Sequence, residues 1–210
     1  MHVGVKICGL TTADDLDAAI DAGVDAIGLV LAASPRRVDR ETALKLLARV
    51  PREVVRVAVV RAPDADTLTT LQALPFDVVQ CDEVDVPLVA PLGRPLLRAF
   101  SDGADLAARI DASGVGRGPL WHNGFLVDGP RGGGKGEQAD FDRARKVASR
   151  GGLVLAGGLD PEVVGLVVRH VHPAGVDVST GVESSPGRKD KGKMKAFVQA
   201  VRAEQRRSAE

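Results

Sequence analysis

The chain has 210 residues, a length that suits one domain with a sizeable core, because single domains commonly grow to about 250 residues before they split. Acidic and basic residues balance at 28 each, which argues against nucleic-acid or anionic-membrane partners, since no overall field would attract them. No apolar run approaches about 18 residues and no signal-peptide pattern opens the chain, so we expect a soluble, cytoplasmic protein. Cys8 and Cys81 are too few for a disulfide framework and are expected to be reduced thiols.

Eight short apolar runs alternate with segments of helical spacing, and each run predicts one strand. The expected strands cover residues 3–7, 25–31, 54–60, 77–80, 95–100, 124–127, 153–156 and 175–178. Two early helices are expected after the N-cap residues Thr12 and Asp39, and later ones over residues 64–74, 102–110, 138–149, 160–171 and 191–204. Pro87 and Pro91 break the helix of the fourth unit, which is the least regular. Residues 205–210 form a polar tail that we expect to fray.

These units predict a fold of the α/β class, a closed parallel (β/α)8 TIM barrel formed as a single domain by residues 1–204. Eight units in 210 residues average about 26 residues each, close to the lower limit for this fold. A doubly wound open sheet is the competing architecture, but it usually has fewer units at this length. Aromatic residues make up only 3% of the chain, so Val, Ala and Leu are expected to form the core.

Two turns of small residues follow the last two expected strands. The first contains Gly157 and Gly158, and the second contains Ser179, Thr180 and Gly181. Each turn taken singly would also suit an ordinary glycine-rich connection from strand to helix. In a barrel, however, the loops after strands seven and eight commonly hold a phosphate with their backbone N–H groups. The pair of turns therefore predicts one shared phosphate site.

Polar side chains occur at the strand ends where barrel enzymes place their chemistry. Alternation along the first strand puts Lys6 and Cys8 on the inner face, and the same pattern puts Asp177 inside the eighth strand. Because closure makes these two strands neighbours, we expect a Lys6–Asp177 ion pair beside Cys8. Asp128 ends the sixth strand, and Arg36 follows the second.

Each of these residues also has an alternative interpretation without chemistry. A buried cysteine is usually an inert small hydrophobe, and Cys8 would become reactive only if Lys6 lowered its pKa. Asp128 precedes Gly129-Pro130 and would suit a turn, while Arg36-Arg37 would suit a solvated loop. The four histidines show no metal-ligand spacing with acidic or cysteine partners, so we expect no metal.

Several motifs carry a resemblance to a known family. They are Lys6-Ile7-Cys8-Gly9-Leu10-Thr11, Ser34-Pro35-Arg36, the strand end at Asp128, Gly133-Gly134-Lys135-Gly136, Leu155-Ala156-Gly157-Gly158-Leu159, and residues 175–187. With these motifs, the chain resembles phosphoribosylanthranilate isomerase of tryptophan biosynthesis from residue 5 to about residue 202. The first and last motifs, in that order and at those ends, are the most specific.

The resemblance implies an Amadori rearrangement of a phosphorylated small molecule, N-(5′-phosphoribosyl)anthranilate, without a cofactor. It implies that Asp128 is the general acid and Cys8 the general base, and that Arg36 pairs with the anthranilate carboxylate. Lys6 and Asp177 are expected to contact the substrate as well. The resemblance assigns the phosphate to Gly157, Gly158, Ser179, Thr180 and Gly181, and a cover over the substrate to the loop with Gly133, Gly134 and Gly136.

Three departures from the family pattern stand out: Gln80-Cys81-Asp82-Glu83 lacks a usual His and Gly, Thr180 replaces Ser, and Lys135 replaces Thr. They leave two alternatives open. One is a broader isomerase of sugar-phosphate aminoaldoses that also acts in histidine biosynthesis, although a single pair of phosphate turns favours a substrate with one phosphate. The other is a catalytically silent barrel that only binds a phosphorylated ligand. The sequence is compatible with a monomer or a homodimer.

Overall fold

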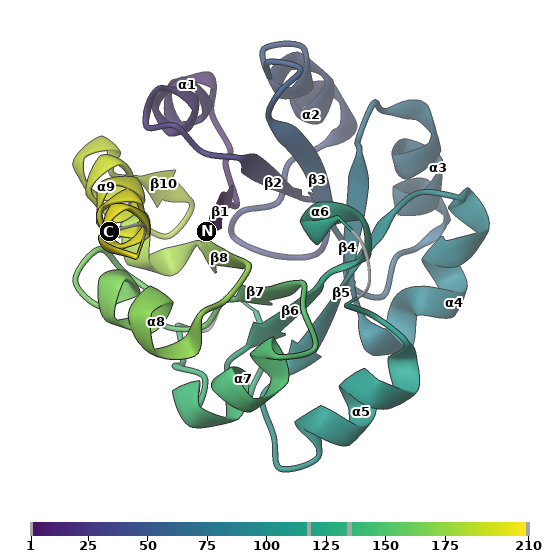
Figure 1. Ribbon diagram of the computed structural model, residues 1–210. Helices are drawn as coiled ribbons and strands as arrows, with labels where there is room; N and C mark the ends of the chain where they lie inside the picture. Colours follow the sequence, from purple (N-terminus) through teal and green to yellow (C-terminus); the bar gives the residue numbers. More distant parts are fainter. Residues whose placement is uncertain (1, 117–118, 134–135, 209–210) are drawn as a thin grey trace.

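The computed structural model describes residues 2–116, 119–133 and 136–208, and eight parallel strands close into a barrel within them (Figure 1). The strands are β1 (Gly4–Cys8), β2 (Ala26–Val30), β3 (Val55–Val59), β4 (Val78–Asp82), β5 (Leu96–Ser101), β6 (Phe125–Asp128), β7 (Leu153–Leu155) and β8 (Gly175–Val178). Each strand pairs with its neighbour in sequence, and β1 pairs with β8, with Lys6 opposite Asp177. The predicted barrel is confirmed, and the open sheet is excluded.

Helices surround the barrel, and the short α6 lies over one end of it, as Figure 1 shows. They are α1 (Ala13–Asp21), α2 (Arg40–Leu47), α3 (Ala65–Ala73), α4 (Val86–Val89), α5 (Leu106–Ser113), α6 (Leu120–Asn123), α7 (Phe141–Ala148), α8 (Val164–Val171) and α9 (Lys191–Arg207). The predicted N-caps are confirmed: Thr12 accepts from the backbone N–H of Asp15, and Asp39 accepts from that of Thr42. None of the helices in the described ranges is long and apolar enough to span a bilayer.

Alternation along the strands separates two apolar regions. Val5 and Ile7 point outward into the large cluster between strands and helices. The smaller cluster fills the barrel interior and consists of Ala26, Val57, Val78, Leu97, Trp121, Leu126, Val154 and Ala156. Trp121 comes from α6, which the sequence did not predict, and it lies so close to Gly4 that a Cβ there would be 2.8 Å from its ring. The aromatic ring thus fills the amino-terminal end of the barrel, and the opposite end is where chemistry can take place.

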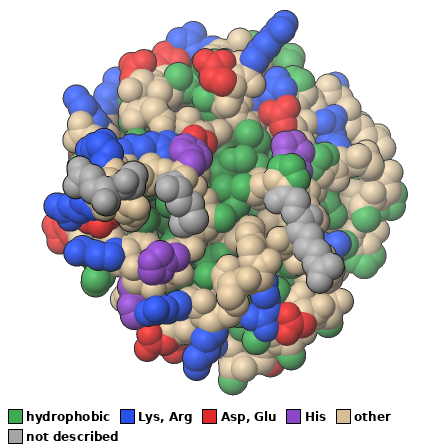
Figure 2. Space-filling model, viewed as in Figure 1, with side chains coloured by type: hydrophobic (Ala, Val, Ile, Leu, Met, Phe, Trp, Pro, Cys, Tyr) green, Lys and Arg blue, Asp and Glu red, His purple; other side chains and the backbone are tan. Residues whose placement is uncertain are grey.

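Figure 2 shows the face of the molecule that Figure 1 shows, with hydrophobic side chains near the centre and charged ones of both signs around the rim. Lys and Arg alternate there with Asp and Glu rather than forming a field of one sign. This distribution agrees with the balance of 28 basic and 28 acidic residues.

Several predicted boundaries were wrong because tertiary contacts move them. The last helix continues to Arg207 instead of ending at Glu204, since the buried Glu204 carboxylate accepts from Arg207 at 2.7 Å and holds the final turn. Helix α5 begins at Leu106 rather than at Asp102, because the Asp102 carboxylate accepts from Arg143 of α7 at 2.6 Å. A short hairpin of β9 (Glu183–Ser185) and β10 (Arg188–Lys189) follows β8 and was not predicted.

Candidate active site

A cavity of about 230 Å³ opens at the carboxyl ends of the barrel strands. Most of the predicted site residues line it: Cys8, Arg36, Asp128, Gly133, Gly136, Gly157, Gly158, Asp177, Ser179 and Thr180. Lys6, whose side chain is fully buried, and Gly181 are not part of this lining. The predicted loop residues Gly134 and Lys135 lie outside the described residues. Within the described ranges, no group of three or more His, Cys, Asp or Glu side chains is placed to hold a metal ion.

The predicted ion pair between the first and last strands is confirmed. Lys6 Nζ donates to Asp177 Oδ1 at 2.9 Å, and both side chains are buried. Burial opposes the charge on Lys6, but the negative charge of Asp177, with Cys8 acting in the same direction, outweighs it, so the pKa of Lys6 is raised. Lys6 therefore stays cationic in the barrel floor.

Cys8 ends β1 and is nearly buried at the cavity wall. Its pKa is raised from the ordinary value, because burial outweighs the positive charges of Lys6 and Lys189. Lys6 does act to lower this pKa, but the same closed barrel that brings the ammonium close also removes water, so the net depression that a reactive thiol needs is absent from the ligand-free protein. In the ligand-free protein the thiol thus keeps its proton at neutral pH.

Asp128 ends β6 and faces the same cavity. Burial raises its pKa to about 6, although the backbone N–H of Gly129 donates to Oδ1 at 2.7 Å and lowers it in part. The nearby negative charge of Asp177 adds to the upward shift. A carboxyl with this pKa carries a proton in a useful fraction of molecules near neutral pH, which is what a general acid requires.

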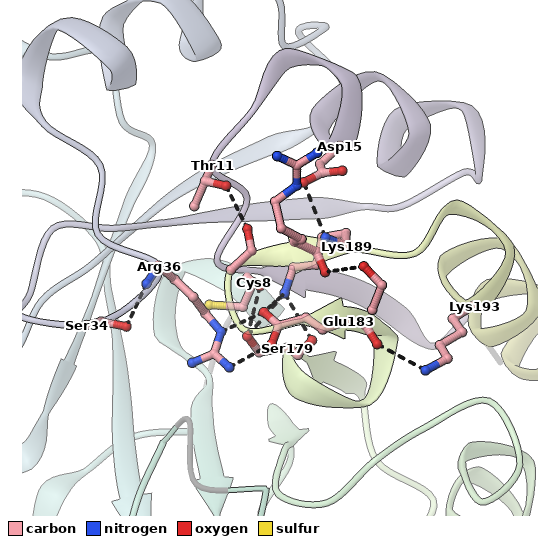
Figure 3. A network of polar contacts seen from close by, with 12 residues as sticks. Cys8, Thr11, Asp15, Ser34, Arg36, Ser179, Glu183, Lys189 and Lys193 are labelled. Carbon is pink, nitrogen blue, oxygen red and sulfur yellow. Dashed lines mark hydrogen bonds and ion pairs between the residues drawn. The ribbon is translucent and has the colours of Figure 1, made fainter.

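Three buried charged side chains form a network beside Cys8 (Figure 3). Arg36 donates from Nε and Nη2 to the two carboxylate oxygens of Glu183, at 2.7 and 2.8 Å. Lys189 Nζ donates to Glu183 Oε1 at 3.0 Å and to the backbone oxygen of Ser179, also at 3.0 Å. Burial lowers the pKa of Lys189 even though Glu183 opposes that shift. Two basic side chains thus share one carboxylate at the cavity wall.

Sequence reasoning gave Glu183 and Lys189 no role, although Glu183 lay inside a quoted motif. Their importance depends on the β9–β10 hairpin, which folds back so that Lys189 pairs with Glu183 in the ladder. A two-residue strand leaves no periodic signal in a sequence. The only available hint was a pair of charged residues on either side of Pro186-Gly187.

The two glycine turns after β7 and β8 lie in direct contact. A Cβ on Gly181 would be 1.9 Å from the carbonyl oxygen of Leu159, so only glycine allows the turns to approach this closely. Gly157 and Gly158 have φ values of 82° and 65°, the left-handed region that favours glycine. Ser179 Oγ donates to the carbonyl oxygen of Cys8 at 3.1 Å, which ties the second turn to the end of β1. One small anion could therefore touch both turns.

Gly133 and Gly136, which are described residues of the loop after β6, line the cavity. A Cβ on Gly133 would be 3.2 Å from Asp128 Oδ2, and one on Gly136 would be 3.4 Å from Thr180 Oγ1. Arg131 at the start of the loop forms an ion pair with Glu137 beyond it. The described parts of this loop thus run from the carboxyl of β6 to the turn of β8.

Fold and site together define the class of protein: a (β/α)8-barrel enzyme whose thiol, carboxyl and paired glycine turns gather at the end of the barrel where such enzymes carry their chemistry. Relatives define the family. The chain belongs to the N-(5'phosphoribosyl)anthranilate (PRA) isomerase family, whose model matches residues 5–200.

Individual relatives support the assignment over nearly the whole chain. The N-(5'-phosphoribosyl)anthranilate isomerase of Acidithiobacillus ferrooxidans is 41% identical, across 95% of this chain and 98% of the relative. The crystal structure of phosphoribosyl anthranilate isomerase from Thermotoga maritima aligns with a TM-score of 0.81 at 29% identity, across 96% of this chain and 100% of the other. A further structure of the isomerase, in complex with reduced 1-(o-carboxyphenylamino)-1-deoxyribulose 5-phosphate, aligns with a TM-score of 0.76 at 27% identity, across 96% and 100%.

Proposed function

We propose that the protein catalyses the Amadori rearrangement of N-(5'-phosphoribosyl)anthranilate to 1-(o-carboxyphenylamino)-1-deoxyribulose 5-phosphate in tryptophan biosynthesis. The observation that carries this proposal is that Cys8 and Asp128 open into one cavity that also contains two touching glycine turns. Membership of the isomerase family and the neighbouring structure with the reduced product support the same reaction.

In the proposed mechanism, Asp128 and Cys8 move protons in opposite directions. Asp128, whose pKa is about 6, gives its proton to the ribose ring oxygen, the C1′–O bond breaks, and the nitrogen lone pair forms a Schiff base at C1′. Once the Cys8 thiol has lost its own proton to solvent, the thiolate takes the C2′ proton and the electrons of that C–H bond form the enol–amine. Protonation of this intermediate at C1′ and loss of the enol hydroxyl proton give the ketone. Lys6 and Lys189 favour the thiolate that Cys8 must form, because both positive charges act to lower its pKa.

Arg36 is the proposed partner of the anthranilate carboxylate. Because Nε and Nη2 already donate to Glu183, we assign the Nη1 end of the guanidinium to the substrate. The pairing fixes the Arg36 rotamer before a ligand arrives, which lowers the entropic cost of binding. Arg36 and Lys189 share the single negative charge of Glu183, and the substrate carboxylate would supply a second negative charge beside them.

The phosphate of the substrate is proposed to bind at the turns after β7 and β8. Gly181→Ala is expected to raise KM at least about tenfold, because the new Cβ would collide with Leu159 and separate the turns, and because well-placed charge-assisted hydrogen bonds are worth more than about 1.4 kcal/mol each. The matched control is Gly165→Ala in α8, where the nearest atom to a Cβ is 3.6 Å away. Unchanged KM for Gly181→Ala, measured with the control under initial-rate conditions, would refute this phosphate assignment.

The function is tested by the decay of phosphoribosylanthranilate fluorescence after addition of the purified protein. Rescue of a tryptophan auxotroph that lacks this isomerase checks the same activity in cells, and a barrel that only binds ligands would rescue nothing. A parallel assay with the aminoaldose of histidine biosynthesis separates the narrow isomerase from a broader one. We also propose a cytoplasmic location, because the thiol of Cys8 must remain reduced to act as a base.

A further inference from the structure

Gln80 has a buried oxygen that accepts no hydrogen bond from the described residues of the chain. Its Oε1 atom is shielded from solvent, and the residue as a whole is 9% exposed. Buried polar side chains are almost always hydrogen-bonded, and the exceptions call for an explanation such as a ligand.

The orientation of Gln80 follows from its place on β4. Val78, two residues earlier, belongs to the barrel interior, whereas Val79 and Cys81 belong to the outer cluster. Gln80 therefore lies on the same inward face of β4 as Val78, and it lines the cavity. Its side chain emerges where the apolar filling of the barrel ends.

The neighbours of Gln80 on either side offer its amide oxygen no donor. Val59 of β3 and Leu97 of β5 are its register partners, and both have apolar side chains. The nearby cation Arg61 donates to Asp82 at 2.7 Å, and Lys6 across the barrel donates to Asp177. The hydrogen bonds that these two cations make are thus directed at carboxylates and not at this oxygen.

We propose that Gln80 binds the substrate, with its amide oxygen accepting a hydrogen bond from an N–H or O–H group between the phosphate and the aromatic ring. This inference rests on the proposed function, because the anilino N–H and the sugar hydroxyls are the donors that such a substrate brings. Gln80 also gives β4 a specificity role: a ligand without a donor at this position leaves the oxygen unpaired and binds less tightly. Asp82, two residues further along β4, keeps its ion pair with Arg61 at the rim of the barrel.

The test replaces the amide by a side chain of similar length without an acceptor. For Gln80→Met, the affinity for reduced 1-(o-carboxyphenylamino)-1-deoxyribulose 5-phosphate, measured by titration calorimetry, is expected to fall about 5- to 100-fold. Binding of inorganic phosphate is expected to stay unchanged, and the melting temperature of the ligand-free protein is expected not to fall, since the variant buries no unpaired oxygen. The matched control is Gln72→Met on the exposed face of α3.

The outcomes separate this inference from the proposed function. Equal affinity of Gln80→Met and the unaltered protein for the reduced product would overturn the role of Gln80 and leave the function intact. Failure of the unaltered protein to bind the reduced product would overturn the function and this inference with it. Gln80→Leu, a second apolar replacement, provides the same measurement if Gln80→Met does not fold.

Discussion

Asp128→Asn is expected to lower kcat/KM for N-(5'-phosphoribosyl)anthranilate by about 100- to 10,000-fold, the usual contribution of a general acid. The amide keeps an oxygen that can accept from the backbone N–H of Gly129, so the turn after β6 retains its bond. What the variant loses is the transferable proton, which is held by a carboxyl whose pKa burial raises to about 6. Initial rates with the variant measure the loss, and a rate near that of the unaltered protein would exclude Asp128 as the acid.

The same substitution should change how the free energy of unfolding depends on pH. The folded protein binds the Asp128 proton more tightly than the unfolded chain, because the pKa is about 6 in place of 3.8. The contribution of this group to the free energy of unfolding is therefore fully present below about pH 4 and is lost as pH rises through about 6. A shift of roughly two pKa units corresponds to about 3 kcal/mol.

Urea unfolding at about pH 4 and at about pH 7.5 tests this sign. Asp128→Asn lacks the titrating group, so its free energy of unfolding should gain up to about 3 kcal/mol relative to the unaltered protein between the two pH values. Parallel pH dependences for the two proteins would show that burial does not raise this pKa. At about pH 7.5 we therefore expect Asp128→Asn to be more stable and nearly inactive, which is the usual trade-off between stability and activity at an active site.

Local pattern was enough to predict the barrel and much of its site. The alternation of side chains along the first and last strands, together with closure of the barrel, predicts that Lys6 lies opposite Asp177. In the structure Lys6 Nζ and Asp177 Oδ1 are 2.9 Å apart. The contact between the two turns, which the structure places at Leu159 and Gly181, could also be anticipated, because consecutive strands of a barrel are neighbours. These features depend on strand order and on a period of two residues, both of which a sequence displays directly.

The rest depends on how elements far apart in the chain exclude water or fold back. The pKa of Cys8 has two opposed causes, and only the closed barrel shows that burial outweighs Lys6. Glu183 and Lys189 join Arg36 through a hairpin too short to predict, and Trp121 enters the barrel from a helix of four residues. Gln80 was quoted only as part of a departure from the family pattern, and its role follows from an oxygen that the fold leaves unpaired.

Cys8→Ser is expected to reduce kcat by about 100- to 10,000-fold, because a serine hydroxyl is a far weaker base than a thiolate at any pH at which the protein is folded. The replacement of one atom should leave the affinity for the reduced product nearly unchanged. Cys81→Ser is the matched control, since Cys81 belongs to the outer cluster of β4, and burial raises its pKa to about 12. Turnover should therefore survive in Cys81→Ser and be lost in Cys8→Ser.

The raised pKa of Cys8 adds a pH dependence to this prediction. In Cys81→Ser, alkylation of the remaining thiol by iodoacetamide should be slow at pH 7 and should accelerate only at alkaline pH, because burial raises the pKa of Cys8 and only the thiolate reacts. The reduced product should protect Cys8 by covering it in the cavity. Mass spectrometry of the alkylated protein measures the rate at each pH. Fast alkylation at pH 7, or near-normal turnover by Cys8→Ser, would remove Cys8 from the role of a base that gains its thiolate only within the reaction.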